Sequence, residues 1–511
     1  MFSPAARVVC CALLFVAPFA TAADPDAGRE LFVRQWLPDD PRSVAGDGLG
    51  PVFNDTSCVA CHNQGGVGGA GPPSKNAQIA SVFSASATFT SVSLSFGSTG
   101  PKIEAGKAGK KTASATRSER EAAKARVARE REQLEKLHPG FLTARSVVVQ
   151  RFSVDPDYAD FHNKLTLDGL TQDFEKFSVG MRRSSDKDDL PKLAAGQSAL
   201  FNQVLREARL NGFTRLLGQR KVGDVVVLVN ERNTPPLFGS GIIDAIPDSV
   251  LLAAAKKKHA GYPEVSGRVA RLKGDKLGRF GWKSQQTNLR GFVLNACAVE
   301  LGLEVPGHAQ AIAPHKPDYV APGLDMTEEQ CNELVSFVEH LPQPRQQLPA
   351  DAKAAAYLAG GRKLFDSTGC AACHTPDLGE ASGIYSDLLL HDMGPGLSDV
   401  GAYGSIAPNA TEEEELKQPL PPLVTIDPKA KPLKPADETK LIGAMRQEWR
   451  TPPLWGLRDS APYFHDGRAA TAEQAIALHD GEAKRSTRQY FRLSAAERLQ
   501  LTAFLNSLAS P

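Results

Sequence analysis

The chain repeats one ordered set of sequence landmarks, and this repeat limits the folds open to it. Each half contains a Gly-Arg-x-Leu-Phe segment, a Cys-x-x-Cys-His motif and a Thr-Pro-Pro-Leu segment, in that order. Each half then ends in an amphipathic pattern that opens with a capping box, a Ser or Thr followed three residues later by Glu or Gln. The paired landmarks lie at residues 28–32 and 361–365, 58–62 and 370–374, 233–239 and 450–456, and 327–341 and 494–508. Four landmarks in one order indicate two copies of one module.

The two copies predict two related domains behind a removable leader. We predict a signal peptide at residues 1–22, a first domain at residues 23–345 and a second domain at residues 352–511. A Pro- and Ala-rich stretch, residues 342–356, joins them. The first domain is longer because of insertions. One of these, residues 102–137, is rich in Lys, Arg, Glu and Ala and predicts an exposed helix, whose positive charge could instead dock an acidic partner.

Helical spacing of apolar residues outweighs the alternation that is typical of strands. Apolar residues recur at helical spacing after both capping boxes, and segments between residues 119 and 208 and between residues 288 and 303 are also typical of helix. Sustained alternation is confined to residues 146–149 and 225–229. The predicted fold is therefore mostly α, with two tandem cytochrome c-like domains and short strands in the first half.

The first residues are typical of an export signal. Arg7 supplies a positive charge, residues 8–17 are almost wholly apolar, and Ala20-Thr21-Ala22 suits a signal peptidase. The apolar run is shorter than the ~20 residues of a spanning helix, and no later segment reaches that length. We predict export to the periplasm and no membrane span, with an uncleaved anchor as the alternative. Loss of the signal leaves 58 basic and 58 acidic residues, which argues against nucleic acid as a partner.

Two cysteines lie outside both the signal and the Cys-x-x-Cys-His motifs. Cys297 and Cys331 could form a disulfide in an oxidising compartment. They could equally remain two buried free thiols, because the sequence does not supply the geometry of a bridge.

The two Cys-x-x-Cys-His motifs have the spacing that attaches c-type haem. Two thiols one helical turn apart add to the haem vinyl groups, and the histidine directly after them becomes the proximal iron ligand. Zinc is the alternative for a Cys-x-x-Cys pair, but zinc needs no histidine directly after each pair. The sequence therefore predicts two covalently bound haem c groups, held by Cys58, Cys61 and His62 and by Cys370, Cys373 and His374.

Beyond these motifs, the chain resembles the bacterial di-haem cytochrome c peroxidases and, more closely, the di-haem oxidoreductases related to them. The resemblance covers most of the chain outside residues 1–22 and 102–137. It is carried by Arg-Thr-Pro-Pro-Leu-Trp-Gly-Leu at 450–457 and Ala-Pro-Tyr-Phe-His-Asp-Gly-Arg at 461–468, and by residues 231–247, 280–283, 392–397 and 475–483. It implies two facing haem domains, with electron transfer at the C-terminal haem and peroxide binding at the N-terminal haem. Peroxidase relatives also hold a calcium ion between the domains, but no compact carboxylate loop identifies one here.

The distal iron ligand of the C-terminal haem follows from the same resemblance. The relatives place an axial ligand fourteen residues after the position of His465, and this position is His479. We predict His479, which would make this haem bis-histidine and lower in potential than a His/Met centre. Met393 on a preceding loop is the alternative ligand.

The N-terminal haem lacks an equivalent ligand in the sequence. Aligning Thr471 with Thr287 brings His479 opposite Asn295, with no histidine or methionine beside it. The peroxidases usually carry a displaceable distal histidine soon after the first haem motif. Here none occurs before His138. We predict an open first haem, with ligation by His138 or His162 as the alternative.

Other candidate residues come from the segments that carry the resemblance. Glu231 and Arg232 are candidates for acid/base catalysis and charge stabilisation at the first haem. Arg450 and Arg468 could pair with haem propionates, for which the arginine fork is suited. His465 is predicted to lie near a haem. The tryptophans could relay electrons or simply be core residues; they are Trp282, Trp449 and Trp455.

Together these observations predict a periplasmic di-haem oxidoreductase. Its second haem would take electrons one at a time from a small redox protein and pass them to the first, where hydrogen peroxide or another small oxidant is reduced. In reverse, the scaffold could oxidise a substrate, as in relatives that modify tryptophan on a partner protein. The non-enzymatic alternative is an electron carrier with both irons six-coordinate, so the coordination of the first haem separates the two functions.

Overall fold

The computed structural model describes residues 23–84, 93–97, 100–104, 117–166, 190–213, 218–399, 401 and 447–511. The predicted signal peptide lies outside these residues. The described helices are α1 (Pro25–Val33), α2 (Cys58–Cys61), α3 (Arg117–Leu137), α4 (Tyr158–Thr166), α6 (Ala195–Phe213), α7 (Ser240–Asp244), α8 (Asp248–Ala254), α9 (Leu289–Glu300), α10 (Glu328–Glu339), α11 (Ala352–Ser367), α14 (Ala472–Leu478), α15 (Lys484–Arg492) and α16 (Ala495–Asn506). The strands are β1 (Val52–Phe53), β2 (Ala77–Ser84), β3 (Ser93–Gly97), β4 (Gly100–Glu104), β5 (Ser146–Val149), β6 (Phe152–Ser153), β7 (Gly218–Val222), β8 (Val225–Arg232), β9 (Ala270–Arg271), β10 (Leu277–Gly278), β11 (Leu390–Asp392) and β12 (Glu448–Arg450). Helix thus exceeds strand, as predicted.

The first and last helices of each half cross at a glycine. In the first half α1 packs on α10, and a Cβ on Gly28 would lie 1.9 Å from the Glu333 carbonyl oxygen. In the second half α11 packs on α16, and a Cβ on Gly361 would lie 2.2 Å from the Gln500 carbonyl oxygen. A larger residue would push each helix pair apart. The glycine of the repeated segment is therefore explained by the same close crossing in both halves.

The predicted capping boxes are confirmed at both helices that close the halves. Thr327 and Gln330 cap α10, and Ser494 and Glu497 cap α16, with the side chain of each pair bonded to the backbone of the other. Such boxes depend on residues three apart and on nothing distant, so the sequence was sufficient to predict them.

A four-stranded antiparallel sheet is inserted in the first half, in the order β5-β2-β8-β7. The strands predicted at residues 146–149 and 225–229 are confirmed as β5 and β8. Leu134 and Leu137 of α3 belong to the apolar cluster that covers this sheet. The register pairs Ala77, at the start of β2, with Arg232, at the end of β8. The sheet therefore places Ala77 and Arg232 side by side at the same end of neighbouring strands.

Two secondary-structure predictions need correction. The helix predicted at residues 102–137 begins only at Arg117, because residues 102–104 belong to β4, where Ile103 pairs with Leu94 of β3. Residues 105–116 lie outside the described residues. Strands are also not confined to the first half, since β11 pairs with β12 in the second.

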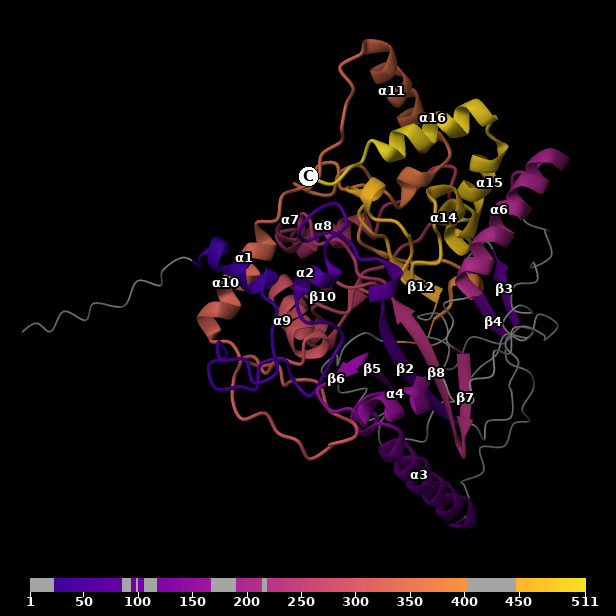
Figure 1. The fold of residues 1–511 in the computed structure, drawn as a ribbon. Coiled ribbons are helices and arrows are strands. Elements are labelled where there is room, and N and C mark those ends of the chain that lie inside the picture. The colour runs from indigo at the N-terminus through magenta and orange to yellow at the C-terminus, as the bar shows by residue number, and fades with distance from the viewer. Residues whose placement is uncertain are drawn as a thin grey trace, which may run out of the picture.

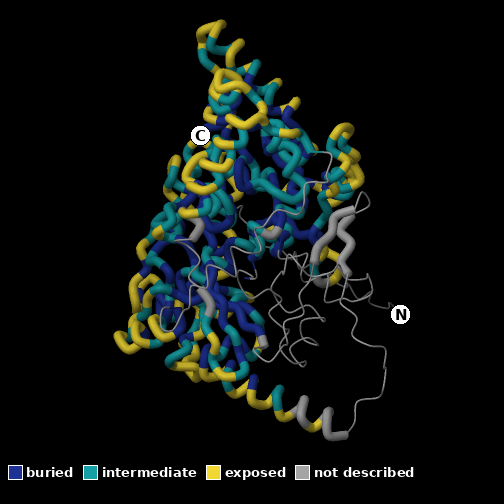
Figure 2. Tube along the Cα trace, turned by 90° about the vertical axis from the view of Figure 1, so that its right-hand side faces the viewer, coloured by how far each residue is buried: buried dark blue, intermediate teal, exposed yellow. Residues whose placement is uncertain are grey.

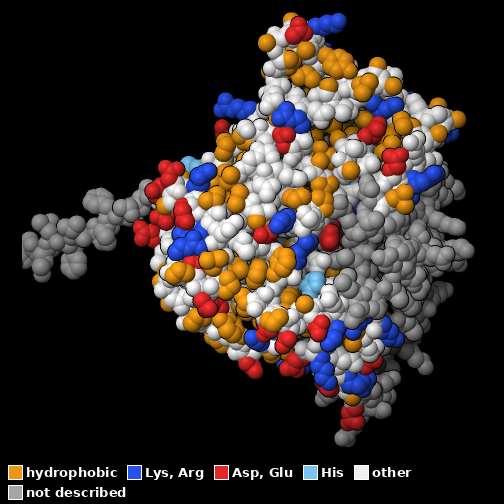
Figure 3. Space-filling view, viewed as in Figure 1, with side chains coloured by type: hydrophobic (Ala, Val, Ile, Leu, Met, Phe, Trp, Pro, Cys, Tyr) orange, Lys and Arg blue, Asp and Glu red, His pale blue; other side chains and the backbone are white. Residues whose placement is uncertain are grey.

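The helices α11 and α16 of the second half lie at the opposite end of the molecule from α3. In Figure 1 the helices α11 and α16 are at the top, and the sheet and α3 are at the bottom right. Buried residues run through the middle between them (Figure 2). Basic and acidic side chains mix over the surface in the view of Figure 3, including the tip that α3 forms. Among the described residues, no helix has the length and apolar character to cross a membrane.

Candidate functional site: two Cys-x-x-Cys-His centres

A cavity with about 990 Å³ of empty space lies beside the first Cys-x-x-Cys-His motif. The wall is formed by α2, the edge of the sheet, the loop around Trp282 and the helix α9. Its residues include Cys58, Cys61, His62, Ala77, Arg232, Asn233, Gly281, Trp282, Gln285, Phe292, Val293, Ala296 and Glu300.

The first motif forms a single helical turn that ends at its histidine. Ser57 caps α2 by accepting a hydrogen bond from the Ala60 amide, so Cys58 and Cys61 lie one turn apart. His62 follows at the C-cap, and its Nδ1 donates to the Gly69 carbonyl oxygen at 3.1 Å. This bond leaves Nε2 as the ligand atom. Burial lowers the pKa of His62 to about 4, so the ring is neutral at neutral pH, as a metal ligand must be.

The glycine-rich segment at residues 65–71 lies close to its neighbours. Gly69, which supplies the carbonyl for His62, leaves no space for a side chain, because a Cβ there would lie 1.8 Å from the Gln64 carbonyl oxygen. Only glycine can hold this carbonyl in place for the histidine.

The second motif repeats this arrangement. Cys370 starts a short 3₁₀ helix, Cys370–Ala372, and His374 follows Cys373. The Nδ1 atom of His374 donates to the Tyr385 carbonyl oxygen at 2.9 Å, which again leaves Nε2 for a metal. Burial lowers the pKa of His374 to about 4.

His479 faces His374 at the distance that a shared iron would impose. Their ring centroids are 6.5 Å apart. An iron between two imidazoles separates the centroids by about 6.4 Å, since each metal–nitrogen bond is ~2.0 Å and each ring adds roughly 1.2 Å. His479 is the C-cap of α14, and its Nδ1 donates to the Ala475 carbonyl oxygen at 2.7 Å. Both rings therefore offer Nε2, as a bis-histidine site needs.

Met393, the alternative ligand, lies on the loop after β11. Its amide donates to the Gln447 carbonyl oxygen at 2.9 Å. The ring-to-ring distance thus favours His479 as the partner of His374.

The first centre has an alanine where the second has His479. The helices α9 and α14 are capped by Asn288 and Thr471, and aligning these caps places His479 opposite Ala296. Ala296 lines the cavity, whereas Asn295, the position given by the sequence alignment, is buried and is not part of the wall. The alignment was therefore wrong by one residue, because Asn288 and not Thr287 is the cap.

The cavity wall offers one histidine, His62, and neither a methionine nor a tyrosine among the described residues. His138 lies elsewhere, with its Nδ1 accepting from the Gly140 amide. His162 contacts the Gln78 side chain through Nε2. The structure therefore brings neither alternative histidine to the first centre.

These two centres can be set beside the comparisons with known proteins. A family model described as "Di-haem oxidoreductase, putative peroxidase" matches residues 217–430 and 435–508, more than half of the chain. The chain belongs to the di-haem oxidoreductase family. No curated protein matches it in sequence.

Two solved structures show weak likeness to this di-haem oxidoreductase. Hydrazine synthase of Kuenenia stuttgartiensis is 19% identical with a TM-score of 0.29, over 54% of this chain and 72% of that chain. A MauG-like protein associated with microbial copper homeostasis is 14% identical with a TM-score of 0.26, over 62% of this chain and 90% of that chain. At these values the two likenesses do not bear on function, and the assignment rests on the family match.

A backbone bridge joins the first cavity to the second half. The indole Nε1 of Trp282 donates to the Asn233 carbonyl oxygen at 2.9 Å, and both residues line the cavity. The Trp282 carbonyl oxygen accepts the amide of Arg450, whose Nε donates to the Gly281 carbonyl oxygen at 2.9 Å. Asn233 and Arg450, which begin the two repeated segments, are therefore both hydrogen-bonded to Trp282. Trp282 thus lies where the two halves meet.

The two arginines predicted to bind propionates have different surroundings. Arg450 is buried with no carboxylate partner among the described residues, and burial lowers its pKa to about 10. A buried guanidinium without an anion suits a propionate. Arg468 instead pairs with Asp466 at 2.7 Å and donates to the Gly396 carbonyl oxygen. Asp466 and Arg468 lie two positions apart in the Asp-Gly-Arg segment, so Arg468 already has a carboxylate partner.

Trp449 lies between two side chains from opposite halves. The Lys283 amine is 3.5 Å from its ring centroid, and the ring of His465 stacks on it at 3.6 Å and 7°. Arg232 is nearby, with its guanidinium carbon 5.3 Å from the same ring and an ion pair of 2.6 Å to Asp399. This stack was not predicted, because it joins four distant segments.

Glu231 is not part of the cavity wall, and a hydrogen bond to Asn76 connects it to the wall. Its carboxylate accepts a hydrogen bond from Asn76 at 2.8 Å, and Asn76 accepts one from Asn233 in the wall at 3.0 Å. Arg232 is itself part of the wall. Of the remaining tryptophans, Trp455 belongs to the apolar core. Cys297 and Cys331 are free thiols and both are buried, the second of the two alternatives.

The buried amine of Lys283 should make stability depend on pH. Burial lowers its pKa to about 7, so the unfolded chain binds more protons between about pH 7 and about pH 10 and stability rises across that window. Relative to Lys283→Met, the native protein should gain roughly 2–3 kcal/mol in unfolding free energy between about pH 6.5 and about pH 9. Denaturant unfolding of both proteins at the two pH values measures this gain. Parallel pH profiles would contradict it.

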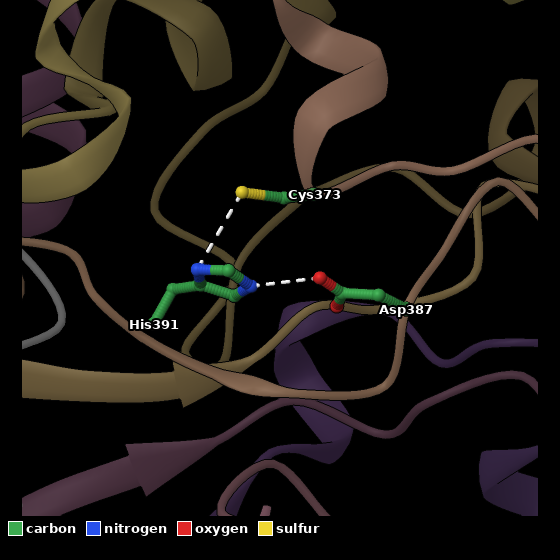
Figure 4. A group of neighbouring side chains, drawn as sticks. All are labelled: Cys373, Asp387 and His391. Atoms are coloured by element: carbon green, nitrogen blue, oxygen red, sulfur yellow. Dashed lines mark hydrogen bonds and ion pairs between the residues drawn. The ribbon is translucent and has the colours of Figure 1, made fainter. Parts of the chain in front are cut away.

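A further cluster adjoins the second motif. Nδ1 of His391 lies 3.5 Å from the Cys373 sulfur and 2.6 Å from Glu482, and Nε2 lies 2.9 Å from Asp387. Figure 4 shows the His391 ring contacting the Cys373 sulfur through one nitrogen and the Asp387 carboxylate through the other. These three residues offer ligand atoms within 4.8 Å of one another. A thioether at Cys373 would remove the thiolate, and both ring nitrogens already face carboxylates, so the cluster suits a charge network better than a metal.

Proposed function

We propose that this chain is an exported di-haem c-type oxidoreductase that reduces hydrogen peroxide or another small oxidant at its first centre. The haems would be attached through the two cysteine pairs, with His62 and His374 as proximal ligands. A small redox protein would supply electrons one at a time to the second centre. Reduction of one peroxide to two waters consumes two such electrons and two protons.

The asymmetry of the two distal positions carries this proposal. His374 faces His479, whereas the equivalent helix position in the first half is Ala296, which lines the same cavity as His62. A haem supplies an iron that can bind and reduce an oxidant only where a coordination position is open. The second centre, closed by two histidines, suits electron transfer, and the first suits a substrate.

The wall around Ala296 suits a small, weakly charged substrate. Gln285 lines the cavity, and its amide nitrogen has no hydrogen-bond partner among the described residues. It can donate to a bound oxygen atom. The charge of Arg232 is balanced by Asp399, so the wall holds no unopposed cation at this point. Phe292 and Val293 make the remainder apolar, which excludes water.

Electron paramagnetic resonance of the oxidised holoprotein tests the proposal. We expect one low-spin signal from the second centre and one high-spin signal from the first, with only the high-spin signal changing when peroxide is added to the oxidised or half-reduced protein. Two low-spin signals that ignore peroxide in both states would show an electron carrier and contradict the proposal.

A further inference from the structure

A loop of the first half lies directly on the second Cys-x-x-Cys-His motif. It follows α8 and reaches Tyr262, whose hydroxyl donates to the Ser367 carbonyl oxygen at 3.0 Å. A Cβ on Gly369, the residue before Cys370, would lie 2.2 Å from the Tyr262 ring. The glycine thus lets the tyrosine ring rest against the start of the motif. The loop places first-half residues next to the second centre.

Ion pairs and hydrogen bonds hold this loop in place. Glu264 pairs with Arg485 of α15 at 2.7 Å, and the Ser266 amide donates to Glu482 at 2.9 Å. Farther along, Arg268 pairs with Glu448 of β12 at 2.5 Å. The loop is therefore held against the second half by several contacts.

Three consecutive lysines stand at the start of this loop. Lys256, Lys257 and Lys258 are all exposed and form no ion pair with a described residue. The next residue, His259, lies within electrostatic range of Asp387, His391 and Glu482, the cluster at Cys373. We call residues 256–258 the lysine loop.

Two acidic residues that contact the rest of this loop are already engaged. Glu264 is neutralised by Arg485, and Glu482 contacts His391 and the Ser266 amide. The lysines therefore present positive charge that no described residue pairs, on a chain whose total charge is only +1. Such a patch steers an oppositely charged partner toward the surface that carries it.

We propose that the lysine loop is the docking surface for the acidic face of a small redox protein that delivers electrons to the second centre. This inference rests on the proposed function, because it assumes that electrons enter at the Cys370–His374 motif. A partner held on these lysines would lie beside Tyr262 and the start of that motif. Each encounter transfers one electron from the partner to the second haem and forms no bond.

The helix α3, the other basic segment, is a poorer docking surface. It lies at the opposite end of the molecule from the second-half helices (Figure 1). Two of its described cations are already paired, Arg126 with Glu130 at 2.9 Å and Lys136 with Glu132 at 2.8 Å. The sheet region therefore provides a matched control.

Stopped-flow reduction of the holoprotein by reduced flavodoxin, an acidic electron donor, tests the proposal. The test variant carries Lys256→Glu, Lys257→Glu and Lys258→Glu. The control reverses three exposed basic residues near the sheet, Arg131→Glu, Lys164→Glu and Lys221→Glu, which changes the net charge equally. At low salt the lysine-loop variant should react roughly 10- to 100-fold more slowly than native, the control within about two-fold, and the difference should vanish at high salt.

Equal rates for the two variants at low salt would overturn the proposal. Unchanged electron transfer together with lost binding to phosphatidylserine vesicles would also overturn it, since the loop would then serve a membrane. Peroxide turnover with dithionite as donor bypasses docking and tests the proposed function separately. If the first centre does not react with peroxide, the proposed function is wrong, but the flavodoxin result still tests the docking surface.

Discussion

Replacing Ala296 with histidine should abolish peroxide reduction while leaving the second centre intact. Ala296 lies in the wall of the first cavity at the position that His479 occupies in the second half, counted from the caps of α9 and α14. A histidine there would offer an imidazole to the open face of the haem held by His62. Because a sixth strong ligand blocks substrate access, we expect turnover to fall at least ~100-fold, equivalent to about 2.7 kcal/mol of barrier.

Two further substitutions at position 296 distinguish the effect of a new iron ligand from the effect of a narrower cavity. Ala296→Leu narrows the cavity but brings no ligand, so the high-spin signal of the first centre should persist. Ala296→Ser changes little and should retain most activity. Only the histidine variant should convert the first centre to low spin in electron paramagnetic resonance. If Ala296→His and Ala296→Leu lose activity equally and both remain high-spin, the two helices do not present equivalent positions.

The one-residue difference between Asn295 and Ala296 shows where sequence reasoning was limited. Thr287 and Asn288 are both good N-cap residues, and the sequence alone does not choose between them. The structure chooses Asn288, whose side chain accepts the Gly291 amide at 2.8 Å. A shift of one residue on a helix turns the side chain by ~100°, which moves it from the cavity into the core.

Features set by local spacing were predictable. The capping boxes and the β5 and β8 strands follow from residues a few positions apart. The strand β2 was missed because it is a central strand with both faces buried, so Ile79, Ala80 and Val82 are all buried and give no clean alternation. Residues 102–104 were assigned to helix from the charge-rich composition of the insertion, whereas pairing with β3 makes them strand.

Features that join distant segments gave no local signal. The stack of Lys283, Trp449 and His465 joins two loops and the strand β12, and no spacing along the chain predicts it. The same holds for the contact of Tyr262 with Gly369 across the two halves. Contacts between distant segments leave Arg450 without a described carboxylate partner, and they place the loop around Tyr262 next to the second centre. Motif spacing could therefore identify the two centres but not how they are connected.

Replacing His479 with alanine should convert the second centre to high spin and slow electron delivery to the first. His479 is held by its Nδ1 bond to Ala475 and lies 6.5 Å from His374, so its loss removes the sixth ligand and one fixed hydrogen bond. We expect the low-spin signal of the second centre to disappear and donor-driven peroxide turnover to fall roughly 10-fold or more. The conservative control is His479→Met, which should keep the iron six-coordinate and raise its potential, because His/Met ligation favours the reduced state.

The same variants decide between His479 and Met393. If Met393 were the ligand, His479→Ala would leave the second centre low-spin, and Met393→Leu would make it high-spin. The facing rings of His374 and His479, each with Nδ1 engaged by a carbonyl, favour the opposite outcome. Leucine at position 393 should then leave the spectrum and the potential unchanged. Spectra of both variants, with the native protein as reference, therefore assign the axial ligand independently of peroxide turnover.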